Sequence, residues 1–199
     1  MKKLLLFVAV LTLVSFKTAD TTLTAEERKF ALDELSRTRE NLLNGIKGLS
    51  LEQLNFKSTP TSWSIAECTE HLAISENNLW GAMDGCLKQP ADPAKRGEVK
   101  FGDADLLKMI TDRSFKVKTM EPFEPKGASF EESVKDFTSK RDAHLEYVKT
   151  TKDDLRNHFA QMPFGTLDAY QVIIFMSGHT ARHTAQIEEV KVDANYPKK

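Results

Sequence analysis

Cysteine is scarce in this sequence, and its placement argues against a disulfide-stabilised fold. The 199 residues include two cysteines, Cys68 and Cys86, which both fall within one expected helix. A separation of 18 residues corresponds to about 27 Å along a continuous helix, whereas a disulfide needs Cα atoms within about 7 Å. We therefore expect no intramolecular disulfide, unless the helix breaks at Gly81 or Gly85.

The sequence also lacks an apolar run of about 20 residues, the length that crosses a bilayer. Residues 4–16 are almost entirely apolar, follow a positively charged start and precede a polar break. These are the parts of a secretory signal peptide. We therefore expect a signal peptide over residues 1–20, export to the periplasm or the medium, a single domain over residues 21–199 and no stable membrane anchor. A buried N-terminal helix of a cytosolic protein is the alternative.

No strong charge imbalance and no basic stripe interleaved with aromatic residues are present. The formal net charge is -1, with 40% hydrophobic and 29% charged residues. This balance is typical of a soluble globular domain and gives no indication of a nucleic-acid partner. Internal repeats and low-complexity segments are missing as well, so one compact domain is expected.

Helix-start signals recur along the chain. A Ser or Thr followed three residues later by Glu is the capping-box pattern, and it occurs at Thr24 with Glu27, Ser64 with Glu67 and Ser129 with Glu132. Apolar residues at helical spacing follow each start, and Thr166 is expected to cap a fourth helix. The predicted helices cover residues 24–49, 64–85, 129–150 and 166–192.

Four long helices joined by polar connectors predict an all-α fold, a four-helix bundle. Between its second and third helices lies an insertion over residues 88–128, with one short helix expected at residues 103–113. A long, poorly patterned insertion of this kind is a candidate lid or interface. The first half of the fourth helix, residues 169–176, is apolar on nearly all sides, which is typical of the central helix of a bundle.

A pair of histidines, His179 and His183, stands directly after this apolar stretch. Residues four apart share one helix face, so both imidazoles can reach one metal ion. The zinc-protease pattern His-Glu-x-x-His is excluded because Thr180 occupies the position of its catalytic Glu. The alternative interpretation is a pair of solvated histidines near a helix end.

His71 lies among the apolar residues of the second helix and could complete a three-histidine site. Bundles build metal sites from inward side chains on facing helices. Three neutral imidazoles suit Zn, Ni, Fe or Co and leave open positions for water or substrate. A histidine packed in the core is the alternative for His71, and we expect His144 and His158 to be exposed.

Two segments resemble the signatures of the DinB-like superfamily. They are the Trp-Ser-Ile-Ala-Glu-Cys-Thr-Glu-His-Leu run at residues 63–72 and the His-x-x-Arg-His-x-x-Gln pattern at residues 179–186. The resemblance covers residues 24–192 and implies a four-helix bundle whose divalent metal is held by three histidines. By matching position these are His71, His179 and His183. Members include metal-dependent hydrolases of the YfiT type and thiol-dependent S-transferases that use bacillithiol or mycothiol, and many are homodimers.

These observations predict a metal-dependent hydrolase that uses metal-activated water on an unknown small molecule, with Zn, Ni, Fe or Mn as the divalent ion. No general base stands out and no catalytic residue is assigned, because Glu70 and Glu76 are expected at the surface. Five residues are expected to support the metal ligands or to line the cleft: Glu67, Ser75, Asn78, Arg182 and Gln186.

Two other functions remain open. The protein could bind metal without catalysis, as a stress or interaction protein, which the lack of an evident base favours slightly. It could instead be a thiol S-transferase. Export makes that second alternative less favourable, because low-molecular-weight thiols are chiefly cytosolic.

Overall fold

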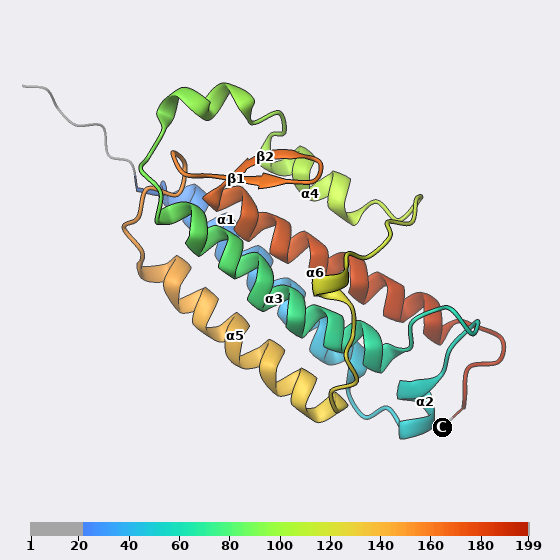
Figure 1. Cartoon of the computed structure of the whole chain (residues 1–199). Coiled ribbons are helices and arrows are strands. Elements are labelled where there is room, and N and C mark those ends of the chain that lie inside the picture. Colours follow the sequence, from blue (N-terminus) through green and yellow to red (C-terminus); the bar gives the residue numbers. More distant parts are fainter. Residues whose placement is uncertain (1–21, 199) are drawn as a thin grey trace, which may run out of the picture.

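The computed structural model describes residues 22–198, so the predicted signal peptide over residues 1–20 lies outside the described residues. Four long helices form the body of the molecule: α1 (Ala25–Ile46), α3 (Ile65–Leu87), α5 (Phe130–Thr150) and α6 (Ala169–Lys191). α6 packs against α1 and α3, and α5 packs against the other side of the same two helices (Figure 1). The predicted four-helix bundle is confirmed.

Local side chains start each long helix. Thr24 and Ser64 form complete capping boxes with Glu27 and Glu67. Ser129 caps α5 through one hydrogen bond, which its side chain accepts from the backbone N–H of Glu132 at 3.1 Å. Two of the three predicted boxes are therefore complete, and the third is half formed.

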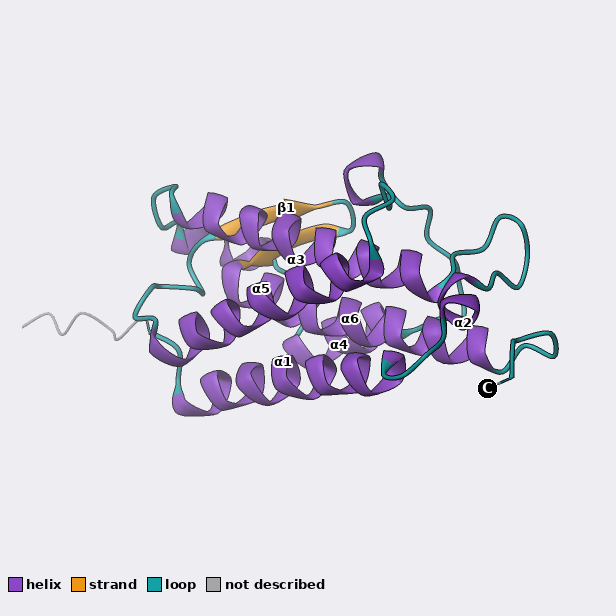
Figure 2. Cartoon of the chain, turned by 90° about the horizontal axis from the view of Figure 1, so that it is seen from below, coloured by secondary structure: helices purple, strands orange, loops and turns teal. Residues whose placement is uncertain are grey.

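The start of α6 differs from the prediction. Asp168, not Thr166, is the N-cap, and its carboxylate accepts a hydrogen bond from the backbone N–H of Gln171 at 2.7 Å. Thr166 lies in a two-stranded antiparallel hairpin of β1 (Phe159–Met162) and β2 (Gly165–Asp168). Figure 2 shows these strands in orange. Strands of four residues are too short for an alternating pattern to stand out from the sequence.

The insertion between α3 and α5 contains η1 (Pro93–Glu98), α4 (Asp103–Thr111) and η2 (Glu121–Phe123). α4 lies against α6 at Gly178, where an added Cβ would come within 2.2 Å of Ile110 Cγ2. The segment from residue 112 to residue 129, here called the strap, then leads back to α5. A short helix, α2 (Leu51–Asn55), occupies the connector before α3.

The core follows the apolar faces expected from the sequence. Val172, Ile173 and Ile174 of α6 are 0% exposed, as expected for the central helix. Cys68 and Cys86 lie in the same helix, α3, and both thiols are free. Among the helices of residues 22–198, none has the length and apolar character that spanning a bilayer requires.

Candidate metal centre

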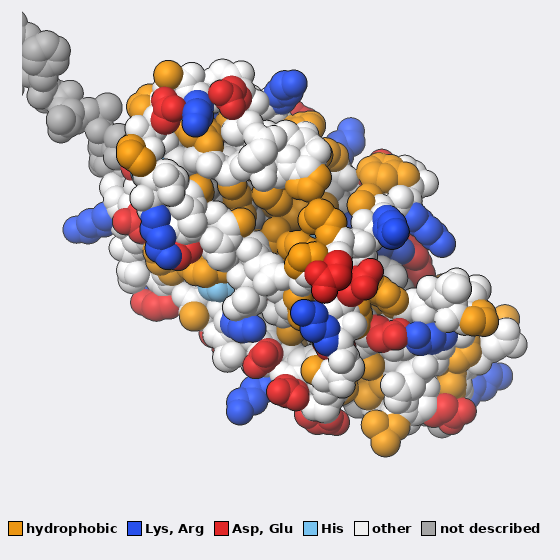
Figure 3. Space-filling view, viewed as in Figure 1, with side chains coloured by type: hydrophobic (Ala, Val, Ile, Leu, Met, Phe, Trp, Pro, Cys, Tyr) orange, Lys and Arg blue, Asp and Glu red, His pale blue; other side chains and the backbone are white. Residues whose placement is uncertain are grey.

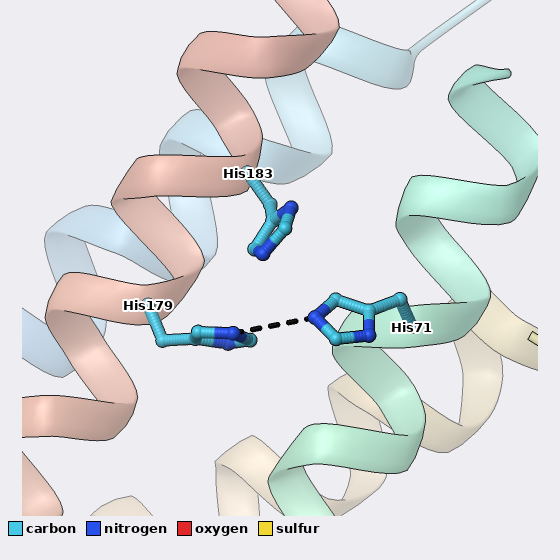
Figure 4. Close-up of side chains that lie close together, drawn as sticks. All are labelled: His71, His179 and His183. Atoms are coloured by element: carbon cyan, nitrogen blue, oxygen red, sulfur yellow. Dashed lines mark hydrogen bonds between the residues drawn. The ribbon is translucent and has the colours of Figure 1, made fainter. Parts of the chain in front are cut away.

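The three predicted histidines meet on one side of the bundle. His71 comes from α3, His179 and His183 come from α6, and their side chains point toward one another (Figure 4). One ring nitrogen from each lies within 4.8 Å of the others. The Nε2 atoms of His71 and His179 are 3.2 Å apart, close to the roughly 3.3 Å that separates two nitrogens bound to a tetrahedral zinc ion with bonds of about 2.0–2.1 Å.

Hydrogen bonds orient two of the three rings. His71 donates its Nδ1–H to the backbone carbonyl of Phe123 at 2.6 Å, and His183 donates its Nδ1–H to the side-chain oxygen of Gln186 at 2.9 Å. Each ring therefore has the tautomer in which Nε2 carries the free lone pair. A donor bond from the far nitrogen is the usual arrangement of a metal-binding histidine, so the residues fit a divalent ion.

Burial keeps the three imidazoles neutral. It lowers the pKa of His179 well below its usual value, and the neighbouring His183 and His71 lower it further. Burial, followed by the charge of His71, lowers the pKa of His183 to about 3. Burial also lowers the pKa of His71, against the opposing hydrogen bond to Phe123. Neutral imidazole is the form that binds metal, so no proton needs to be displaced at neutral pH.

A cavity of about 610 Å³ opens beside the histidines. All three line it, together with apolar side chains from α4, the strap, the hairpin and α6, among them Met109, Phe115, Phe164 and Phe175. Figure 3 shows hydrophobic side chains gathered in a hollow in the middle of this face. The size and the apolar walls are those of a small-molecule site.

Two charged side chains anchor the strap at the cavity through hydrogen bonds to its backbone. The carboxylate of Glu70 on α3 accepts hydrogen bonds from three consecutive backbone N–H groups, those of Lys126, Gly127 and Ala128. The expectation that Glu70 is a surface carboxylate was wrong, since it is only 6% exposed. Its two oxygens satisfy backbone donors that would otherwise be left unpaired against α3.

The guanidinium of Arg182 fastens the other end of the strap. It donates to the backbone carbonyl groups of Ile110, Asp112 and Phe115. The nearby carboxylate of Glu189 on α6 pairs with Arg113 instead, at 2.5 Å. Between the two ends, Asn78 of α3 donates a hydrogen bond to the carbonyl of Pro122 at 2.8 Å. The neighbouring carbonyl of Phe123 accepts the hydrogen bond from His71 Nδ1.

The other predicted support residues lie in different surroundings. Gln186 lines the cavity and holds His183. Glu67 accepts from the backbone N–H of Ser64 and pairs with Lys57 at 2.7 Å, so it is occupied as a cap. Ser75 is 2% exposed, and its hydroxyl has no hydrogen-bond partner within residues 22–198. Neither Ser75 nor Asn78 lines the described cavity.

The sequence interpretation missed a buried polar cluster, formed by Glu76, Arg141 and His144, which are 2%, 0% and 5% exposed. Arg141 donates to both oxygens of Glu76, and His144 Nδ1 donates to Glu76 Oε2 at 2.9 Å. The predictions that Glu76 and His144 are exposed were therefore wrong. His158 is partly buried, and its Nδ1 donates to the Cys86 carbonyl at 3.1 Å.

Helical spacing contained the signal for this cluster. Arg141 and His144 lie on the same face of α5 as the buried residues Phe137 and Val148, at intervals of four, three and four residues. Positions with this spacing share one face of a helix. A charged residue on an apolar face indicates a buried, paired group as readily as a break in the pattern.

Comparison with known proteins gives three matches. The family model described as the DinB superfamily matches residues 34–187. The uncharacterized protein YuaE of Bacillus subtilis is 26% identical over 153 residues, which cover 74% of this chain and 89% of YuaE. The structure of YfiT from Bacillus subtilis, described as a probable metal-dependent hydrolase with an unusual four-helix bundle topology, matches with a TM-score of 0.61 at 14% identity, over 88% of this chain and 92% of that one.

Proposed function

The chain belongs to the DinB superfamily, and from this premise we propose that it is a hydrolase whose divalent metal is held by His71, His179 and His183. One observation carries the proposal. Three neutral imidazoles converge at the wall of an apolar cavity, and two of them have the far nitrogen fixed by a hydrogen bond. YfiT, which shares the fold, is described as a probable metal-dependent hydrolase, and this supports the same reaction class.

The side chains around the site have distinct parts in this proposal. When bound, a divalent ion such as Zn, Ni, Fe or Mn supplies Lewis acidity and an activated water near neutral pH. The Phe123 carbonyl and Gln186 orient His71 and His183. The apolar walls exclude bulk water, which strengthens every electrostatic interaction inside the cavity.

A second candidate function is thiol S-transfer. Among the described residues that line the cavity there is no Asp and no Glu, so no carboxylate is placed to take a proton from a nucleophile. A thiol is acidic enough to ionise without a strong base. This observation favours the S-transferase alternative, and it is equally compatible with a metal-binding protein that has no catalytic activity.

The decisive experiment measures metal content and activity together. Purified protein is loaded with Zn, Ni, Fe or Mn and tested on esters, amides and thiol-conjugation substrates, beside His179→Ala and the control His158→Ala. We expect His179→Ala to lose bound metal and hydrolysis, and His158→Ala, outside the triad, to keep both. Hydrolysis that survives His179→Ala would rule out the metal mechanism, and thiol conjugation without hydrolysis would support the second candidate.

We also propose that the protein is exported, with residues 1–20 as its signal peptide, and that it forms a homodimer. Export is supported by the positively charged start and the short apolar run of those residues, and dimerisation only by the family resemblance. Mass spectrometry of protein from the periplasm or medium tests the first proposal, since an intact Met1 would contradict it. Sedimentation analysis tests the second.

A further inference from the structure

We propose that the cavity beside the histidines takes a small molecule with an apolar body and an anionic head group. The inference rests on the proposed function and names the substrate class of that same site. Two properties of the lining carry it, namely its apolar walls and the sign of its charge. Each property restricts a different part of the ligand.

The walls select the apolar body. Phe164 and Phe175 stack with ring centroids 5.2 Å apart, and Phe175 in turn stacks on His179 at 5.9 Å. Met109, Met120 and Met162 add flexible apolar surface, which adapts to irregular shapes. A ligand bound against these side chains would therefore place its apolar part directly beside the three histidines.

The strap exposes apolar side chains that such a ligand would cover. Phe115, Val117 and Met120 are 50%, 68% and 51% exposed, and all three line the cavity. Clustered exposed apolar residues mark a binding surface. The strap itself is held by Glu70 and Arg182, so these side chains are kept at the cavity instead of turning into the core.

The charge of the lining selects the head group. The described lining residues include four cations and no acidic residue. Arg113 is paired with Glu189, and Arg182 is occupied by strap carbonyl groups. The exposed side chains of Lys116 and Lys118 make no ion pair within residues 22–198. Lys116 acts electrostatically on Glu189, and Lys118 also lines an adjoining hollow with Glu67 and Glu124. None of these carboxylates lines the cavity itself, so its lining keeps an excess of positive charge on the strap side, which favours an anion.

A matched ligand series tests the inference. Octanoate, 1-octanol and octylammonium share one apolar chain and differ in head-group charge, and their binding to the zinc-loaded full chain is measured by calorimetry. We expect octanoate to bind most tightly and octylammonium most weakly. The double variant Lys116→Gln/Lys118→Gln should weaken octanoate binding about 3- to 10-fold, as expected for loss of partly exposed charge interactions, and leave octanol binding unchanged.

The matched control is Lys135→Gln/Lys152→Gln, which removes two lysines that do not line the cavity. It should bind all three ligands like the unaltered protein. Equal affinity for the three ligands would overturn the anionic head group. An octanoate preference that survives Lys116→Gln/Lys118→Gln would overturn its recognition by the two strap lysines. Absence of octanol binding would overturn the apolar ligand.

Ester hydrolysis is recorded in parallel so that the two proposals can be separated. Octanoate preference without hydrolysis of any ester would leave the ligand class standing and remove the hydrolase proposal. Hydrolysis of neutral and cationic esters as fast as anionic ones, without any octanoate preference, would leave the hydrolase standing and remove the ligand class.

Discussion

Gln186 illustrates how a residue outside the three proposed metal ligands can set their geometry. Its side-chain oxygen lies 2.9 Å from His183 Nδ1, one turn along α6. This bond fixes both the tautomer and the rotation of the ring. Without it, His183 could turn away from the other two imidazoles or place its proton on Nε2, and either change costs binding energy at the metal.

We therefore expect Gln186→Ala to weaken zinc binding about 10- to 100-fold, the usual effect of removing a hydrogen-bond partner of a ligand. Competition against a chelator of known affinity measures the change. Gln89→Ala is the control, because Gln89 is exposed in the connector just after α3 and does not line the cavity. Unchanged affinity in Gln186→Ala would show that His183 is held by packing instead, for example against Trp63, whose ring centroid is 6.0 Å away.

Helical spacing and apolar neighbours made His71, His179 and His183 candidates, and the resemblance to the DinB-like superfamily selected the three together. The structure brings their ring nitrogens within 4.8 Å of one another. The sequence was not sufficient for Glu70 and Glu76. Each carboxylate is buried by partners distant in the chain, the strap backbone for Glu70 and Arg141 for Glu76. Spacing on α5 indicates that Arg141 and His144 face inward, but no local pattern around Glu70 or Glu76 identifies the partner that each carboxylate meets.

At the scale of elements, the long helices were predictable and the connections were not. Thr24 and Ser64 cap their helices through residues only three positions away. The strap, by contrast, has one regular element, η2, of three residues, and its path is set by Glu70 on α3 and Arg182 on α6. Tertiary contacts of this kind have no periodic signature in the sequence.

The contact of α4 with α6 depends on Gly178. An added Cβ there would come within 2.2 Å of Ile110 Cγ2 and 3.0 Å of Leu107 Cδ1, so α4 would have to move. We expect Gly178→Ala to lower the free energy of unfolding by about 1–3 kcal/mol, as overpacking does, despite the better helix propensity of Ala. Since Met109 and Ile110 line the cavity, binding of apolar ligands should weaken as well.

Urea unfolding measures the change, with Gly81→Ala as the control. Gly81 lies in the exposed part of α3, and an added Cβ would meet nothing within 4 Å. The free energy of unfolding of Gly81→Ala should be about 0.5–1 kcal/mol higher than that of the unaltered protein, because Ala reduces the backbone entropy of the unfolded chain. A stability gain of the same size in Gly178→Ala would show that α4 adjusts without cost.

For the whole molecule, Arg141 connects all four long helices. From α5 it donates to the Leu35 carbonyl and Thr38 of α1, to Glu76 of α3 and to Thr180 of α6. A fully buried guanidinium is costly unless its donors are satisfied, and here each nitrogen has a partner. The arrangement fixes the relative positions of the helices that carry the histidines.

A double-mutant cycle measures the interaction energy between Arg141 and Glu76. Arg141→Met and Glu76→Leu should each lose about 3–5 kcal/mol of unfolding free energy, because each leaves the other charge buried without its partner. The double variant should lose less than the sum, which gives a large coupling energy. The control pair Lys140 and Asp136 lies on the same helix at 3.6 Å, with side chains 32% and 54% exposed, and should couple by only about 0.3–0.5 kcal/mol. Additive losses at Arg141 and Glu76 would contradict this role.

The cluster of Glu76, Arg141 and His144 predicts that the stability of the protein depends on pH. Burial alone would raise the pKa of Glu76, but the charge of Arg141 and the hydrogen bond from His144 outweigh it and hold the pKa below its usual value. A depressed folded-state pKa contributes stability above the unfolded value of about 4.3, and this contribution is lost as the pH falls through the folded value.

The stability difference between the unaltered protein and Glu76→Gln, measured by urea unfolding, should therefore be largest near pH 7 and shrink below about pH 4.3, as Glu76 takes up a proton. Asp136→Asn, at an exposed position of α5, is the control and should show little difference at either pH. The difference in unfolding free energy between Glu76→Gln and the unaltered protein could instead stay constant down to pH 3. That result would mean that Arg141 does not hold the Glu76 carboxyl ionised. The bundle would then depend on the shape of this cluster and not on its charge.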